Sequence, residues 1–184
     1  GVRGIKLAKE DEVVSLTLLH HSDASTAEAR AYLRQANAAR RAALGEETQV
    51  EEVEDGEENG EEATLTPTRL AELGAREQFV LAASASGFGK RTSSYEYRLT
   101  GRGGSGIVAM AMAKKNSAIV AAFPVEESDH LMLITDGGQT IRVPVASVRI
   151  AGRATQGVTL LRVEEGERVV SVERIEDVSG DEGA

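Results

Sequence analysis

The 184-residue sequence contains no cysteine and no tryptophan, and it has only three phenylalanines and three tyrosines. Without cysteine the chain can form no disulfide, no thiolate nucleophile and no cysteine-ligated zinc site. With so few aromatic side chains, a hydrophobic content of 41% predicts a core of aliphatic residues and alanine. No apolar run approaches the roughly 18 residues that a membrane-spanning helix needs, and no segment has the form of a signal peptide. We therefore expect a soluble, cytoplasmic protein without a membrane partner.

The net charge of −9 at neutral pH conceals an uneven distribution. Ten acidic residues and no basic residue lie between Glu46 and Glu62. The rest of the chain has a net charge of +1, because removing ten negative charges from −9 leaves +1. Phosphate binding depends on local lysines and arginines, since salt screens interactions beyond roughly 8 Å. The acidic composition therefore does not exclude a nucleic-acid partner.

One pattern of glycine and arginine occurs twice at a constant offset of 51 residues, which indicates a repeat protein. A partial third copy opens the sequence, where Gly4-Ile5 is in register with Gly106-Ile107. The arginine that leads the motif would precede residue 1 in this copy, so we expect the chain to begin within a repeat. The offset relates Gly87 to Gly138, Arg91 to Arg142, Arg102 to Arg153 and Gly106 to Gly157.

Short strand-forming segments separated by glycine turns fill each repeat. About four such segments in roughly 50 residues are typical of a propeller-type blade. We predict an all-β fold of about two and a half four-stranded blades, in which residues 79–178 form the complete blades. Residues 1–19 are expected to supply strands of a partial blade, over 5–8 and 13–19, joined by a charged turn.

A different composition interrupts the repeat between residues 20 and 78, which we interpret as an insertion. Ser25 and Glu28 have the spacing of a capping box and precede an alanine-rich run, which predicts a helix over about 26–44. The acidic residues 46–63 have almost nothing to bury, so we expect them to form a disordered linker.

A second, shorter helix is predicted near the end of the insertion. Thr66-Pro67 has the form of a helix start, and the helix should run over about 67–73 before Gly74 ends it. The polar residues 179–184 should form a disordered tail.

Four short motifs follow one another in a fixed order along the chain. They are Gly-Val-Arg-Gly-Ile at 1–5, Gly-Phe-Gly-Lys-Arg-Thr at 87–92, Ile-Thr-Asp at 134–136 and Gly-Arg-Ala-Thr-Gln-Gly-Val at 152–158. In this order and spacing they resemble the carboxy-terminal domain of the bacterial DNA gyrase A subunit, part of a type II topoisomerase. The resemblance covers about 120 of the 184 residues and places the chain at the last blades of that domain.

The resemblance implies a partial β-pinwheel, a propeller-like fold in which neighbouring blades exchange strands and double-stranded DNA bends around a basic rim. It implies sequence-independent DNA binding and wrapping, in support of ATP-dependent negative supercoiling by the whole enzyme. The implied partners are DNA, the rest of the A subunit and the gyrase B subunit. Together the subunits would form an A2B2 heterotetramer, located at the nucleoid of the cytoplasm. ATP and Mg2+ would bind elsewhere in the enzyme, and this chain would hold no cofactor.

The sequence departs from the family pattern in two respects. It lacks the Gln-Arg-Arg-Gly-Gly-Lys-Gly box of the first blade, and its segment 102–106 is similar only to a later, degenerate copy of that box. The insertion at 20–78 is absent from the basic family pattern. The pinwheel of the topoisomerase IV A-type subunit, which serves decatenation, and a protein-binding propeller are the alternatives.

Wrapping requires phosphate contacts at equivalent places on successive blades, because many contacts must offset the free energy of bending DNA. Glycines beside the basic residues let the backbone approach the phosphates. The motif arginines have a second interpretation, in which they lock adjacent blades, and the two adjacent lysines could form a solvated turn. The predicted DNA contacts are Lys90, Arg91, Arg102, Lys114, Lys115, Arg142 and Arg153.

Catalysis finds little support in the sequence. His20 and His21 lie near Asp23, but adjacent histidines point apart on a strand and no third ligand has a suitable spacing for a metal. No Gly-x-x-x-x-Gly-Lys phosphate-binding loop is present. We therefore predict no catalytic residue and no metal site, and expect a non-catalytic part of an enzyme.

Overall fold

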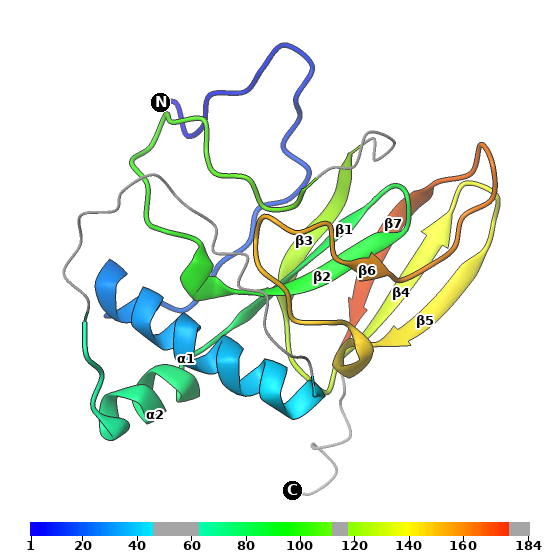
Figure 1. The fold of residues 1–184 in the computed structure, drawn as a ribbon. Helices are drawn as coiled ribbons and strands as arrows, with labels where there is room; N and C mark the ends of the chain where they lie inside the picture. The colour runs from blue at the N-terminus through cyan, green and yellow to red at the C-terminus, as the bar shows by residue number, and fades with distance from the viewer. Residues whose placement is uncertain (46–62, 112–117, 177–184) are drawn as a thin grey trace, which may run out of the picture.

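The computed structural model of the protein describes residues 1–45, 63–111 and 118–176. Two antiparallel β-sheets form its body (Figure 1). The strand order is β3-β1-β2-β6 in the first sheet and β5-β4-β7 in the second. The strands of the first sheet are β1 (Phe79–Ser84), β2 (Phe88–Ser93), β3 (Ile119–Val125) and β6 (Val158–Thr159). Those of the second sheet are β4 (His130–Thr135), β5 (Thr140–Pro144) and β7 (Val169–Ile175).

The strands repeat in space with the offset found in the sequence. We call residues 79–125 the first unit and residues 130–175 the second unit. The single-turn 3-10 helices η1 (Ser94–Glu96) and η2 (Val145–Ser147) occupy equivalent places 51 residues apart. The first turn of each unit is also closed in the same way. The Phe88 amide donates to the Ser84 hydroxyl at 3.3 Å, and the Gln139 amide donates to the Thr135 hydroxyl at 3.0 Å.

The two units exchange a strand. β6 belongs to the second unit by sequence, yet it pairs with β2 of the first unit, with Phe88 opposite Thr159 and Gly89 opposite Val158. Exchange of strands between neighbouring units is what separates a pinwheel from a propeller. The predicted all-β fold, a partial β-pinwheel, is therefore confirmed.

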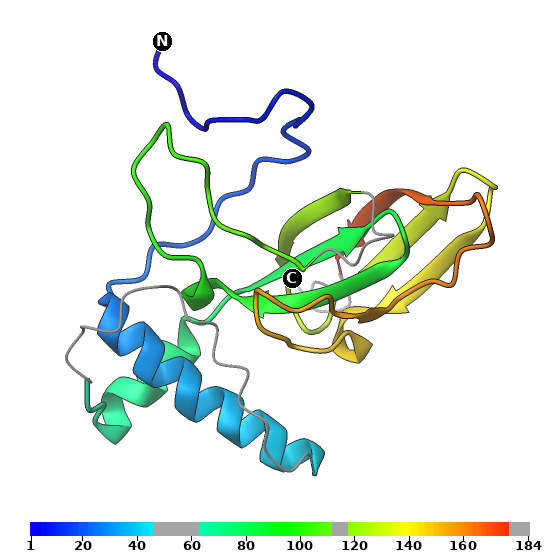
Figure 2. The same ribbon diagram turned by 45° about the horizontal axis from the view of Figure 1, so that its top comes forward.

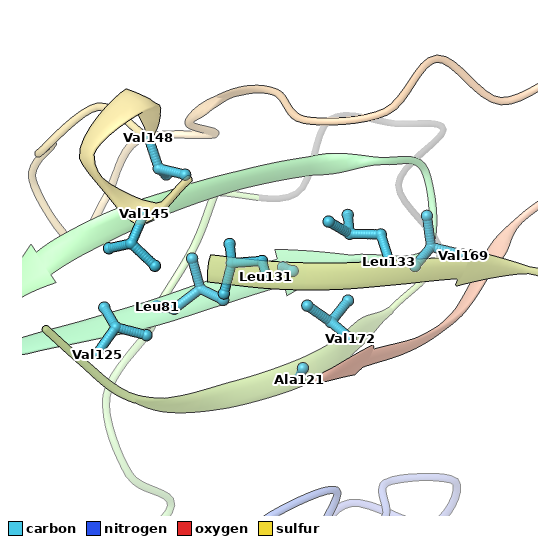
Figure 3. Close-up of a cluster of buried hydrophobic side chains, with 10 residues drawn as sticks. Leu81, Ala121, Val125, Leu131, Leu133, Val145, Val148, Val169 and Val172 are labelled. Carbon is cyan, nitrogen blue, oxygen red and sulfur yellow. The ribbon is translucent and has the colours of Figure 1, made fainter. Parts of the chain in front are cut away.

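An aliphatic core lies between the two sheets (Figure 3). Leu81 of β1 and both Leu131 and Leu133 of β4 are completely buried. Val145 of η2 and the neighbouring Val148 join the same cluster. Among the described residues, the fully buried members of this cluster are all aliphatic, as the composition predicts, and the partly buried Phe79 and Phe123 pack against them. Burial of mainly aliphatic surface therefore stabilises the core.

Two helices lie beside the first unit, outside the sheets (Figure 2). The first, α1 (Thr26–Leu44), begins with the predicted capping box. The Glu28 amide donates to the Ser25 hydroxyl at 3.2 Å, and the Ser25 amide donates to the Glu28 carboxylate at 2.9 Å. Gly45, with a φ of 68°, ends the helix in the left-handed conformation that glycine adopts most readily.

The second helix, α2 (Pro67–Ala75), follows the predicted Thr66 cap but runs past Gly74, where the sequence predicts it to end. Gly74 lies against Tyr32 of α1, and a Cβ atom at this position would sit 3.6 Å from the Tyr32 hydroxyl oxygen. Contact with α1 thus stabilises the last turn in spite of the low helix propensity of glycine.

The prediction of strands at 5–8 and 13–19 is wrong, since the structure has no strand among residues 1–19. Two backbone hydrogen bonds join this segment to the loop before residue 107: the Lys6 amide donates to the Gly104 carbonyl at 2.8 Å, and the Gly103 amide donates to the Gly4 carbonyl at 2.7 Å. Two separate bonds are too few for a strand ladder, so strand propensity alone does not produce a blade here.

Three predicted features lie outside the described residues. They are the acidic linker at 46–63 apart from Ala63, the Lys114-Lys115 turn and the tail at 179–184.

Candidate nucleic-acid interface

The five predicted DNA contacts that the structure describes fall into two groups. Lys90, Arg91 and Arg153 are buried, with at most 5% of their surface exposed. Arg102 and Arg142 are exposed. The sequence predicts one role for all five, whereas the fold gives them different surroundings.

Lys90 on β2 is completely buried. Its ammonium group donates to the carbonyl oxygens of Gly152, Arg153 and Thr155 at 2.6, 2.6 and 2.8 Å. Burial lowers the pKa of Lys90 to about 8; the charge of Glu96 opposes this shift and that of Arg153 adds to it. The three donors of the ammonium group are thus used to hold a loop of the second unit against β2.

Arg91 reaches from the first unit to the second. Its Nε donates to the Val148 carbonyl at 2.7 Å, and its Nη2 donates to the Ala146 carbonyl at 3.3 Å. Its Nη1 forms an ion pair with Glu127, and the guanidinium carbon lies 6.0 Å from the centre of the Phe79 ring. The side chain therefore holds η2 and the residue after it against the first sheet.

Arg153 reaches in the opposite direction, from the second unit to the first. Its Nη1 donates to the Val108 carbonyl at 2.5 Å, and its amide donates to the Glu96 carboxylate at 2.5 Å. Only 4% of its surface is exposed. Together with Lys90 it fixes the loop at 152–155 between the two units.

The burial of Lys90, Arg91 and Arg153 contradicts their predicted role as phosphate contacts. Their charged groups are enclosed and bonded to carbonyl and carboxylate oxygens of the protein, so a phosphate would have to displace those bonds. For the two arginines, the alternative of locking adjacent blades fits the observed contacts.

Arg102 occupies a different setting, an exposed loop beside the amino-terminal segment. The two backbone bonds described above join residues 98–106 to residues 1–6, and we call these two segments the loop pair. Neither segment contains an acidic residue. The exposed basic side chains of the loop pair are Arg3, Lys6, Arg98 and Arg102.

Those four side chains are available to a partner. Within the described part of the chain, none of them forms an ion pair or a side-chain hydrogen bond. Sequence reasoning selected only Arg102. Arg3 did carry a signal, because it lies in the partial motif copy at 1–5, and so did Arg98, which is repeated 51 residues later as Arg149. Lys6 lies in no repeated position and is brought to this cluster by the fold.

Arg142 lies apart from the loop pair, on β5 at the edge of the second sheet. Exposed and half-buried residues alternate along β5, and Arg142 is on the exposed face. Both views show β5 and the loop pair at opposite sides of the molecule (Figures 1 and 2). Arg142 is therefore a separate candidate contact and does not extend the basic surface of the loop pair.

The chemistry of these surfaces is limited to charge and hydrogen-bond donation. Among the described residues, no group of three or more histidines and carboxylates is placed to hold a metal ion. No described helix is both long and apolar enough to cross a membrane. Guanidinium and ammonium groups on glycine-rich loops are suited to binding phosphate oxygens.

A protein-family model matches segments from both units. The family model of the DNA gyrase C-terminal domain, a beta-propeller, matches residues 1–19, 78–126 and 129–176. The matched segments include both halves of the loop pair. They leave out α1 and α2.

Curated relatives match the chain over nearly its whole length. The DNA gyrase A subunit of Granulibacter bethesdensis is 50% identical over 177 residues, which cover 94% of this chain and 19% of that protein. The DNA gyrase A subunit of Rickettsia felis is 44% identical over 183 residues, which cover 99% of this chain and 19% of that protein. The chain thus spans about a fifth of the length of these relatives, and the second alignment includes the helical segment.

Among solved structures, a DNA gyrase A C-terminal domain is similar to this chain with a TM-score of 0.51 and 25% sequence identity. The similarity covers 54% of this chain and 34% of that domain.

Proposed function

The chain belongs to the family of DNA gyrase C-terminal beta-propeller domains, and from this membership we propose that it binds double-stranded DNA without sequence preference and wraps it. The observation that carries the proposal is the loop pair, where four exposed basic side chains lie in two segments that have no acidic residue. Phosphates are suitable partners for such a cluster, since neutralising them releases counterions. Gly103 and Gly106, with φ values of 80° and 77°, keep the loop free of bulky side chains near the arginine.

In this proposal the chain positions DNA and leaves bond chemistry to other parts of a larger gyrase protein. ATP and Mg2+ would bind outside this chain, and the working assembly would be the A2B2 heterotetramer at the nucleoid of the cytoplasm. The relatives are DNA gyrase A subunits, which favours negative supercoiling over decatenation as the activity that wrapping serves.

The test is the salt dependence of DNA binding by the full A subunit. The double variant Arg3→Gln/Arg102→Gln in the loop pair is compared with Arg168→Gln, a control at an exposed arginine that pairs with Asp136 at 3.2 Å on the second unit. If both loop arginines contact phosphates, the slope of log Kobs against log salt concentration should become shallower by about 1.8, because each contact contributes about 0.9.

The control variant should leave the slope unchanged. Negative supercoiling, measured with the B subunit and ATP present, should decrease in the loop-pair variant and not in the control. Equal slopes for the loop-pair variant and the unmodified protein would contradict the proposal.

A further inference from the structure

The second unit holds the chain just after the exposed loop at 98–106, which is one half of the loop pair. Nη1 of Arg153 donates to the Val108 carbonyl at 2.5 Å. The Ala111 amide donates to the Thr155 carbonyl at 3.0 Å. The downstream end of the loop is thus attached to the second unit at two points, although the loop itself is exposed.

The upstream end of the same loop is attached to the same part of the second unit. The single-turn helix η1 ends at Glu96, just before the loop begins. The Glu96 carboxylate accepts a hydrogen bond from the Arg153 amide at 2.5 Å. The Tyr97 amide donates to the Ser94 carbonyl at 3.0 Å and closes η1. Both ends of the exposed loop therefore meet one turn of the second unit, the loop at 152–155.

The loop at 152–155 is itself held in place. The amide and the hydroxyl of Thr155 both donate to the Gly152 carbonyl, at 3.0 and 2.8 Å. The Lys90 ammonium group donates to three carbonyl oxygens of this loop, as described above. The Arg153 side chain is buried, so it can influence a phosphate only through the residues that it holds.

We propose that Arg153 is a positioning residue for DNA binding, which fixes the ends of the loop at 98–106 and thereby places Arg98 and Arg102 against the phosphates. The inference rests on the proposed function and adds to it a dependence of one unit on the next. Because Arg153 is the repeat equivalent of Arg102, the buried copy of the motif holds the exposed copy. A loop whose ends are fixed loses less conformational entropy when its arginines meet DNA.

The first experiment changes Arg153 in the full A subunit and measures binding to duplex DNA of random sequence. Arg153→Met removes the donor to the Val108 carbonyl. We expect the slope of log Kobs against log salt concentration to become shallower by about 0.9, as for one lost phosphate contact, and the affinity at about 0.1 M salt to fall about fivefold. Arg153→Lys keeps the charge and a donor, so it should recover most of the lost affinity.

Arg91→Met is the matched control. It also removes one buried positive charge that joins the two units, but Arg91 bonds to Val148 and Ala146 and not to the exposed loop. The control should keep the slope and affinity of the unmodified protein under conditions where circular dichroism shows both variants folded. An equal loss of affinity in the two variants would mean that Arg153 only stabilises the junction, and would overturn the inference.

Glu96 gives a second test, which applies even if Arg153→Met does not fold. Glu96→Gln and Glu96→Leu both remove a negative charge near the basic loop, which by itself should strengthen DNA binding. Only glutamine keeps an oxygen acceptor for the Arg153 amide. We expect the leucine variant to bind at least about threefold more weakly than the glutamine variant, as for partial loss of one phosphate contact. Equal affinities of the two variants would overturn the inference.

The loop-pair variant separates this inference from the proposed function. If Arg3→Gln/Arg102→Gln changes the salt slope and Arg153→Met does not, the inference is overturned and the proposed function stands. If neither variant changes the slope, both are overturned. If both change it, Arg153→Met should have no further effect on the slope in an Arg98→Gln/Arg102→Gln background, because it acts through those two side chains. A further decrease in that background would overturn the inference.

Discussion

The two units of the pinwheel present the same motif in opposite surroundings. Arg91 is buried, whereas its equivalent Arg142 is exposed. Arg153 is buried, whereas its equivalent Arg102 is exposed. In both pairs the enclosed copy is the one that faces the other unit. A repeated position therefore determines where an arginine stands along the blade, and the neighbouring unit determines what it does there.

The motif glycines show the same difference. Gly87 and Gly138 have φ values of 80° and 85°, so both turns need the left-handed conformation. A Cβ atom at Gly87 would lie 2.0 Å from the Leu161 carbonyl oxygen, whereas a Cβ atom at Gly138 would meet nothing within 4 Å. At this turn glycine is thus required for conformation in both units, and for close approach of a neighbouring backbone only in the first.

The largest difference in unfolding free energy between equivalent substitutions should come from Arg91 on β2 and Arg142 on β5. Arg91→Met removes the donors to two carbonyls in the second unit and leaves these acceptors in a buried junction, which should lower the free energy of unfolding by about 2–4 kcal/mol. Arg142→Met, at an exposed strand position, should change it by less than about 0.5 kcal/mol. Urea unfolding followed by circular dichroism measures both, and equal losses would break the comparison.

Substitutions at Gly87 and Gly138 should differ less in the unfolding free energy that they cost. Gly138→Ala should destabilise by about 1 kcal/mol, because alanine is strained in the left-handed region. Gly87→Ala carries the same strain and must also displace the backbone at Leu161, which should bring its loss to about 3 kcal/mol. Hydrogen exchange of the β6 amides offers a local readout: they should exchange faster in Gly87→Ala and at the normal rate in Gly138→Ala.

The features that could be predicted from the sequence depend on residues close together in the chain. Ser25 and Glu28 form the predicted capping box, since both lie in one helical turn. The offset of 51 residues identifies equivalent turns, because Ser84 and Thr135 close them with the same local hydrogen bond. Local chemistry of this kind is visible in sequence spacing.

The roles of the basic residues could not be predicted in this way. The carbonyl acceptors of Lys90 lie 62 to 65 residues further along the chain, and nothing near Lys90 in the sequence indicates them. Conversely, Arg98 is repeated 51 residues later as Arg149, yet only the contact of residues 98–106 with 1–6 places it in a basic cluster. Whether a basic residue is buried or clustered depends on how the two units pack together. The spacing of residues within one unit does not indicate that packing.

Lys90 allows a third test, because the residue 51 positions later is Ile141. Lys90→Met leaves the carbonyls of Gly152, Arg153 and Thr155 without their shared donor, which should lower the free energy of unfolding by about 2 kcal/mol. Ile141→Met is a volume-conserving change and should cost less than about 1.5 kcal/mol. Thermal unfolding of both variants provides the comparison, and a loss for Lys90→Met no larger than that for Ile141→Met would mean that the ammonium group contributes little to the junction.

The smallest effect expected is a pH dependence that belongs to the first unit alone. Burial lowers the pKa of Lys90 to about 8 from 10.5, so between these values the unfolded chain binds a proton that the folded chain has released. The free energy of unfolding then rises with pH across this range, because the penalty for burying the charge is present below about pH 8 and is relieved above it. The difference in unfolding free energy between the unmodified protein and Lys90→Met should increase by about 1 kcal/mol from about pH 7 to about pH 9.

The corresponding difference for Ile141→Met should stay constant over the same range, since no ionisable group is changed. A constant difference for Lys90→Met as well would mean that the three carbonyl oxygens keep the ammonium group charged throughout this range. In that case the hydrogen bonds that Lys90 donates to the loop at 152–155 outweigh the desolvation of its ammonium group, and the contact between the two units is independent of pH.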